Sequence, residues 1–172
     1  TATSTALPLN IYIMDYLLYY PTIDDGTTDP QLLTNSVSLP RYTDGKGVQI
    51  LAVSTASRTG GQSFTVSYTN SNGVSGRTTT AVVQPASSIV GAIIGNSIAS
   101  DISSSPFLPL QSGDSGVRSI ESVTMNGSDV GLFTLILVKP IAQTQIRGID
   151  APVEKDYLLN INDAPRIYDD AF

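Results

Sequence analysis

The sequence contains no histidine, no cysteine and no tryptophan. Without cysteine there are no disulfides, no thiolate nucleophile, and no cysteine-ligated zinc or iron–sulfur site. Without histidine the chain lacks the commonest general base and the commonest transition-metal ligand. These absences exclude most enzyme mechanisms. The chemistry that remains is that of carboxylates, lysine, tyrosine and serine, or the binding of hard cations through oxygen atoms.

Charge is also scarce, since 14% of the 172 residues are charged against about 25% in typical soluble domains. The net charge is −6 and the nine basic residues are scattered singly, which argues against nucleic-acid binding because phosphate contacts need clustered Lys and Arg. No apolar run reaches the length of a membrane-spanning helix. The first ten residues, TATSTALPLN, lack the basic end and apolar stretch of a signal peptide.

What the sequence has in abundance is turn formers and strand formers. Ten prolines and fourteen glycines interrupt the chain at short intervals and leave no amphipathic helix longer than about two turns. Strands are predicted at 10–21, ending at Pro21, and at 48–54. Two hairpins are predicted, at 62–83 around the turn Asn70–Gly73 and at 117–139, and the second ends in a central strand, LFTLILV, stopped by Pro140.

This spacing of short strands predicts an all-β fold, a single-domain β-sandwich or jelly roll with extended termini. The predicted organisation is an N-terminal arm at 1–10, a β-sandwich domain at 11–150 and a C-terminal arm or tail at 151–172. A chain of 172 residues is long enough for one domain with a sizeable core.

The tetrapeptide Gly-Asp-Ser-Gly at 113–116 surrounds the nucleophilic serine of trypsin-like proteases. Ser115 would need an adjacent base to take its proton, and the chain has no imidazole to serve as one. A Ser–Lys dyad stays formally open, but no lysine lies at a recognisable spacing from Ser115. The motif is therefore interpreted as a turn between an apolar run and the strand that begins near Val117.

One acidic cluster is a weak candidate for a calcium site. Asp24, Asp25 and Asp29 lie within six residues, and Gly26 allows a sharp turn. The cluster lacks the alternating acidic spacing and the bidentate glutamate of an EF-hand loop, so a solvated turn is the favoured interpretation. Glu121 has no identifiable carboxylate partner for glycoside hydrolysis. We expect no cofactor and no catalytic residue.

Tyrosines gather in the segment 10–21, where Tyr12, Tyr16 and Tyr19 are candidates for an interface or a carbohydrate platform. A tyrosine stripe at strand spacing belongs more often to a core or a subunit interface, and the lack of tryptophan weakens the carbohydrate alternative.

Two distant segments, Leu39–Gly45 and Ala164–Asp170, have weakly similar sequences. Each holds a Pro-Arg followed by a tyrosine and an aspartate. An arginine beside an aromatic ring and a carboxylate is able to dock a chain end. The interface candidates from this similarity are Arg41, Tyr42, Arg166 and Tyr168. The alternative interpretation is that the two segments are ordinary turns.

Several phrases occurring in order over most of residues 11–172 resemble a family of tailed-bacteriophage virion structural proteins. They are DYLLYYPTID, LPRYTDGKGVQILAV, FTVSYTNSNGVSGRTT, PFLPLQSGDSGVRSIESVT, LFTLILVKP and PRIYDDAF. The resemblance implies a particle-building protein of the capsid surface or a head-attached structure, in which Gly-Asp-Ser-Gly is a structural turn. It carries no catalytic residues to this chain.

The leading expectation is thus a non-enzymatic virion protein. Among virion proteins, a capsid decoration or cement protein that acts through β-rich interfaces is the favoured kind. Its partners would be the major capsid protein or other virion proteins, and further copies of itself, with a trimer as one option. A receptor-binding or carbohydrate-binding fibre module is the alternative from another class. A hydrolase acting through Ser115 is the third hypothesis, and a major shell subunit stays open.

Overall fold

The computed structural model describes residues 9–33, 37–95, 105–148, 152–154, 156 and 166–171. The prediction of an all-β fold is confirmed, since these residues form nine strands and no helix. No helix able to cross a membrane occurs within these ranges. The strands are β1 (Leu9–Asp24), β2 (Gln31–Leu32), β3 (Gln49–Ser54), β4 (Ser63–Asn70), β5 (Arg77–Thr78), β6 (Val82–Val83), β7 (Ile93–Ile94), β8 (Val117–Met125) and β9 (Leu132–Ile146).

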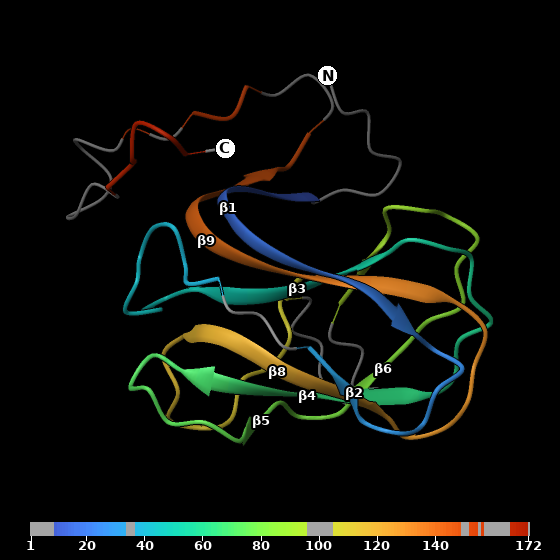
Figure 1. Ribbon diagram of the computed structural model, residues 1–172. Helices are drawn as coiled ribbons and strands as arrows, with labels where there is room; N and C mark the ends of the chain where they lie inside the picture. Colours follow the sequence, from blue (N-terminus) through green and yellow to red (C-terminus); the bar gives the residue numbers. More distant parts are fainter. Residues whose placement is uncertain are drawn as a thin grey trace. The chain divides into compact units, whose positions relative to one another are not determined.

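The strands form two antiparallel sheets (Figure 1). The first sheet has the order β1-β9-β3-β7, and the second has the order β2-β8-β4-β5 with β6 also paired to β4. The central pairing of the first sheet runs from Gln49 opposite Val138 to Ser54 opposite Phe133. Strands that are neighbours in a sheet are therefore mostly distant in the sequence.

The chain divides into two compact units, and the boundaries between them fall within the two longest strands, β1 and β9. One unit is Leu17–Val138, and the other combines Thr1–Tyr16 with Lys139–Phe172. In the second of these units no described apolar side chain is fully buried. There the Gln143 amide donates to the Tyr12 hydroxyl and the Gln145 amide donates to Asn10 Oδ1, each at 3.1 Å. The hydrophobic core belongs to Leu17–Val138.

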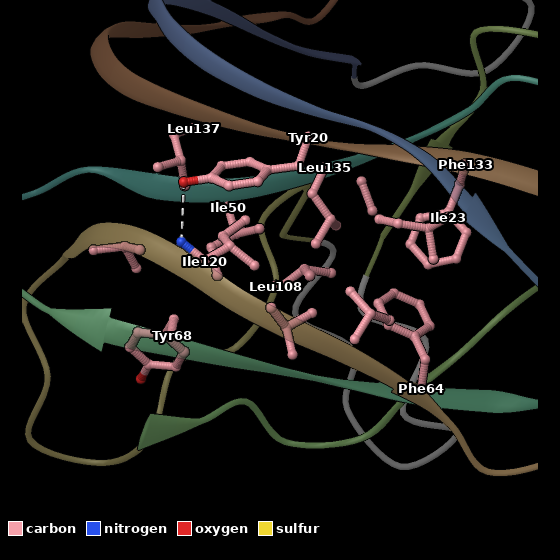
Figure 2. Packing of buried hydrophobic residues seen from close by; sticks show 14 of the residues in the cluster. Tyr20, Ile23, Ile50, Phe64, Tyr68, Leu108, Ile120, Phe133, Leu135 and Leu137 are labelled. Atoms are coloured by element: carbon pink, nitrogen blue, oxygen red, sulfur yellow. Dashed lines mark hydrogen bonds between the residues drawn. The ribbon is translucent and has the colours of Figure 1, made fainter. Parts of the chain in front are cut away.

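Side chains from both sheets fill that core (Figure 2). Strand β4 alternates half-buried Ser and Thr residues with buried Phe64, Val66 and Tyr68, because side chains of successive strand residues point to opposite faces. The rings of Phe64 on β4 and Phe133 on β9 lie 4.9 Å apart. The hydroxyl of Tyr20 on β1 accepts a hydrogen bond of 3.1 Å from the Ile120 amide on β8, which ties one sheet to the other.

The prediction of a β8–β9 hairpin is wrong, because the two strands lie in different sheets. The placement of β9 in the interior of its sheet is confirmed, since it lies between β1 and β3. Its expected cover on both faces is not seen, because Thr134 and Ile136 are only half-buried. The hairpin predicted at 62–83 is reduced to short pairings of β4 with β5 and β6.

Both prolines expected to stop strands lie inside them. Strand β9 continues past Pro140, and β1 continues past Pro21. Proline removes a backbone donor, which a strand tolerates only where no partner needs that donor. The β3–β9 pairing has already ended at Val138, and β1 is the terminal strand of its sheet. Each proline therefore sits where one side of the strand has no neighbouring strand among the described residues.

Candidate functional site

Asp114 of the Gly-Asp-Ser-Gly motif is the centre of a polar network between β4, β5 and the loop before β8. Its backbone N–H donates to Gln111 O at 3.0 Å, which closes a turn over Gln111–Asp114. The carboxylate accepts hydrogen bonds from Tyr68 Oη at 2.7 Å, Asn70 Nδ2 at 2.7 Å and Arg77 Nε at 2.9 Å. Its side chain is 3% exposed. The motif thus joins three segments instead of presenting a nucleophile.

The network moves the pKa values of its acid and its phenol away from neutrality. The hydrogen bond from Arg77 is the main reason why the pKa of Asp114 is lowered to about 2, and the donors Tyr68 and Asn70 add to it. Burial, together with the hydrogen bond to this carboxylate, raises the pKa of Tyr68 to about 12. A general acid or base works best with a pKa near the working pH. Asp114 and Tyr68 are therefore suited to holding structure and not to transferring protons.

Ser115 has a hydroxyl group as its side-chain partner. Its Oγ lies 3.0 Å from Ser71 Oγ, and a serine hydroxyl is no base for a nucleophile. Its backbone carbonyl accepts from Gly47 N at 2.8 Å. Gly116 is required for close packing, since a Cβ there would lie 2.6 Å from that same Gly47 N. The turn lies two residues earlier than predicted, at Gln111–Asp114, and includes only the first half of the motif, since Gly116 already forms a β-bridge with Lys46.

A second carboxylate, Glu121 on β8, has an equivalent role on the outer face of the second sheet. It accepts from the Ser67 and Thr69 hydroxyls of β4, each at 2.8 Å, and from Gly76 N at 3.1 Å. Burial opposes its ionisation, but these donors together outweigh it and lower the pKa of Glu121. Glu121 holds the loop before β5 against β4 and β8.

The acidic segment after β1 does not form one cluster. Asp24 Oδ1 accepts from Gly26 N at 2.8 Å within the turn. Asp25 points inward, is fully buried and accepts from Gln84 Nε2 at 3.0 Å, while Asp29 is exposed. Across the described ranges no three acidic side chains gather in a way that would hold a metal ion. The carboxylates of the weak calcium candidate, Asp24, Asp25 and Asp29, thus do not form one binding site.

The candidate tyrosines have different environments. Tyr12 is half-buried and accepts from Gln143, while Tyr16 and Tyr19 are 39% and 57% exposed. Tyr20, the next aromatic along β1, belongs to the core. The tyrosines therefore differ in exposure, and within the described part of the unit Leu17–Val138 the exposed aromatic of β1 is Tyr19.

Tyr19 borders an apolar groove of 470 Å³. The groove lies between β1, the terminal strand of one sheet, and β2, the terminal strand of the other. Leu32 and Val37 in its wall are 78% and 58% exposed. The lining residues that the structure describes carry no charged side chain, and they are Leu18, Tyr19, Tyr20, Pro21, Leu32, Leu33 and Val37.

The two Pro-Arg segments are not equivalent. Arg41 is 6% exposed and Tyr42 packs against the core, so both belong to the interior of the protomer. Arg166 is exposed and Tyr168 is half-buried. The guanidinium carbon of Arg166 lies 4.5 Å from the centre of the Tyr168 ring, which is a cation–π contact. The two segments therefore have no arrangement in common that would support a shared docking role for the four residues.

No protein-family model, no curated protein and no solved structure is detectably similar to the chain. The site is therefore interpreted from its own geometry.

Sequence reasoning missed the residues that organise the network. Arg77 and Asn70 were not singled out, although a buried aspartate in a turn needs donors and both follow a predicted strand of alternating residues. Arg58 and Gln84 were missed as well, and both are buried. No pattern in the sequence marks them, because the residues that they face lie far away in the chain.

Proposed function

We propose that the chain is a non-enzymatic structural protein of a bacteriophage virion, and that it is a capsid decoration protein. We also propose that its two sheets form a jelly-roll sandwich. The order of the strands is the observation that supports the jelly-roll sandwich in this proposal. Setting aside the short β6, the first strand lies beside the last, the second beside the last but one, and the third and fourth flank those same two strands. Double-sheet jelly rolls with Greek-key connections have this arrangement.

The strand order alone does not select a function, because jelly rolls occur both in viral capsids and in lectin-type domains. Three further features favour a particle-building role. The chain resembles phage virion proteins in several phrases, its composition is poor in charge and lacks histidine and cysteine, and its Gly-Asp-Ser-Gly motif serves as a structural junction.

The apolar groove beside Tyr19 is the surface through which we expect copies of the chain to associate. A net charge of −6 makes most of the surface repel a second copy. The groove has no charged lining, so identical patches meet there without like-charge repulsion. A stable interface buries about 800 Å² on each partner, which makes this groove the centre of a larger contact. Identical patches that face each other close as a twofold dimer, whereas a trimer would pair the groove with a different surface of the neighbouring copy.

The decisive experiment is to locate the chain in its native particle by cryo-EM reconstruction. Several hundred copies that follow the shell lattice are expected for a decoration protein. A few copies at one vertex or on the tail would favour the fibre module instead, and complete absence from particles would refute the virion assignment.

The association surface has its own test, which uses purified protein and sedimentation velocity. Leu32→Lys places a charge in the groove and should weaken self-association at least about tenfold, since an unpaired buried charge disfavours an apolar contact. The matched control is Val74→Lys, at a residue 51% exposed in the turn after β4. Equal effects of the two substitutions would remove the groove from the proposal.

Carbohydrate binding is the second candidate, because Tyr19 offers an exposed ring beside the groove. Its test is a glycan array with wild-type protein and a Tyr19→Ala variant. A specific signal that the variant loses would favour the binding module over the decoration protein.

A further inference from the structure

All buried side-chain atoms that lack a hydrogen-bond partner in the described part of the chain fall in one cluster. They are Asp25 Oδ2, Gln84 Oε1, Asp129 Oδ2 and the three guanidinium nitrogens of Arg58. Asp25 is fully buried, Gln84 is 1% exposed and Arg58 is 6% exposed. Buried polar groups in native proteins nearly always have partners. A concentration of unpartnered groups at one place therefore indicates a missing polar species.

The backbone fixes the four side chains at this place. Asp25 N donates to Gly131 O at 3.1 Å, and Asp129 N donates to Asp25 O at 2.8 Å. Arg58 pairs with Ser87 in both directions, at 2.8 and 3.2 Å. The residues come from the segments after β1, β3 and β6 and from the connection between β8 and β9, which are far apart in the sequence.

Asp25 and Arg58 meet beside Gly131, the residue just before β9. A Cβ at Gly131 would lie 2.5 Å from the unpartnered Asp25 Oδ2 and 2.7 Å from Arg58 Cβ. Gly131 has a φ of 151°, and its lack of a side chain lets the Asp25 carboxylate and Arg58 come this close to its backbone. The donors of Arg58 and the unpartnered acceptors thus share one region without bonding each other.

The charges decide which species fits. A metal cation would satisfy the three unpartnered oxygens but would be repelled by the Arg58 guanidinium. An anion would satisfy the guanidinium but would be repelled by Asp25 and Asp129, which both interact electrostatically with Arg58. Water both donates and accepts, and a buried water typically makes about three hydrogen bonds to otherwise unsatisfied groups.

We propose that this cluster is an internal water site, in which ordered water bridges the Arg58 guanidinium to the carboxylates of Asp25 and Asp129 and to Gln84 Oε1. Arg58 also lies in the wall of a surface groove of 350 Å³, whose other lining residues include the hydroxyl-bearing Ser57, Ser87 and Ser88. That groove is the path by which water would enter. The site lies within the unit Leu17–Val138 and is independent of the proposed virion role.

The test is a crystal structure of the full chain at neutral pH and high resolution. We expect density for at least one water within about 3.2 Å of an Arg58 nitrogen and of one of the unpartnered oxygens, the usual range of hydrogen bonds. Direct bonds from Arg58 to Asp25 or Asp129 with no density between them would overturn the proposal.

Two further measurements separate water from an ion. Crystals soaked in rubidium and in bromide should show no anomalous signal at the cluster, and a signal from either would overturn the assignment to water. In solution, the Arg58 Nε–H should show a cross-relaxation peak to a long-lived water. An Asp25→Asn, Arg58→Met, Asp129→Asn variant lacks this Nε–H, so the loss of the peak from its spectrum assigns the peak to Arg58. If the Arg58 Nε–H of the wild type shows no such peak, the proposal fails.

Discussion

Removing the Asp114 carboxylate should destabilise the protein far more than removing the hydroxyl of its neighbour Ser115. In Asp114→Ala the donors of Tyr68 and Asn70 lose their acceptor, and both residues are buried. A buried donor without a partner costs about 1–3 kcal/mol. Arg77 is 26% exposed on its side chain, so it turns to water and contributes little.

The expected loss is therefore about 3–4 kcal/mol from a total free energy of unfolding of about 5–15 kcal/mol. For a chain of this size that corresponds to a fall in Tm of about 10 °C. The assay is urea unfolding followed by circular dichroism, with the slope m compared between variants to check that unfolding stays two-state.

Ser115→Ala is the matched control, because the exposed Ser115 hydroxyl bonds only Ser71. It should cost less than about 1 kcal/mol. A Tyr68→Phe partner completes a double-mutant cycle, in which the double variant should be less destabilised than the sum by about 1–2 kcal/mol. If Asp114→Ala and Ser115→Ala had equal effects, the view of Asp114 as the structural centre would be refuted.

Acid provides an independent measurement of the same group. The pKa of Asp114 is lowered from 3.8 to about 2 in the folded protein. A group whose folded pKa is lowered contributes stability above its unfolded pKa and loses it as the pH falls through the folded value. The difference in stability between wild type and Asp114→Ala should therefore be constant above about pH 5 and shrink between about pH 4 and 2. A difference that did not change over that range would contradict the assignment.

Three other substitutions test the packing. Tyr20→Phe removes the acceptor of the Ile120 amide and should cost about 1–3 kcal/mol in urea unfolding. Phe133→Ala empties a fully buried site and should cost about 3–5 kcal/mol, with thermal unfolding as the assay. Gly116→Ala places a Cβ against backbone and should reduce soluble yield severely, whereas Gly95→Ala, whose Cβ would have a nearest contact of 3.4 Å, should leave the yield unchanged. Equal yields would contradict the close approach at Gly116.

The alternation of residues was sufficient to find the strands but not their sheets. The segment around Phe64 and Val66 alternates clearly, and β4, β8 and β3 lie close to their predicted positions. The connection from β8 to β9 looked like a hairpin because its turn residues, Asn126 to Asp129, are typical of one. Turn chemistry shows that the chain reverses, but it does not show which sheet the next strand joins.

The candidate site was predictable only where its physics is local. The residues at 113–116 predict a turn, and the observed turn over Gln111–Asp114 includes the first two of them, while the absence of an imidazole disfavours catalysis by Ser115. The partners of Asp114 come from positions about 40 residues away, and those of Asp25 from about 60 and 100 residues away. Such contacts depend on the strand order, which no local pattern contains.

The interior position of β9 has a consequence for how the chain is made. Strands β1 and β3 are neighbours of β9 and not of each other, so the first sheet cannot close until Leu132–Ile146 have left the ribosome. Until then the apolar faces of β1 and β3 stay uncovered in the nascent chain. Pairings between such distant segments fold slowly and expose strand edges to aggregation. Biogenesis should thus depend on keeping nascent chains apart, and a lower expression level or a lower temperature should raise the yield of folded protein.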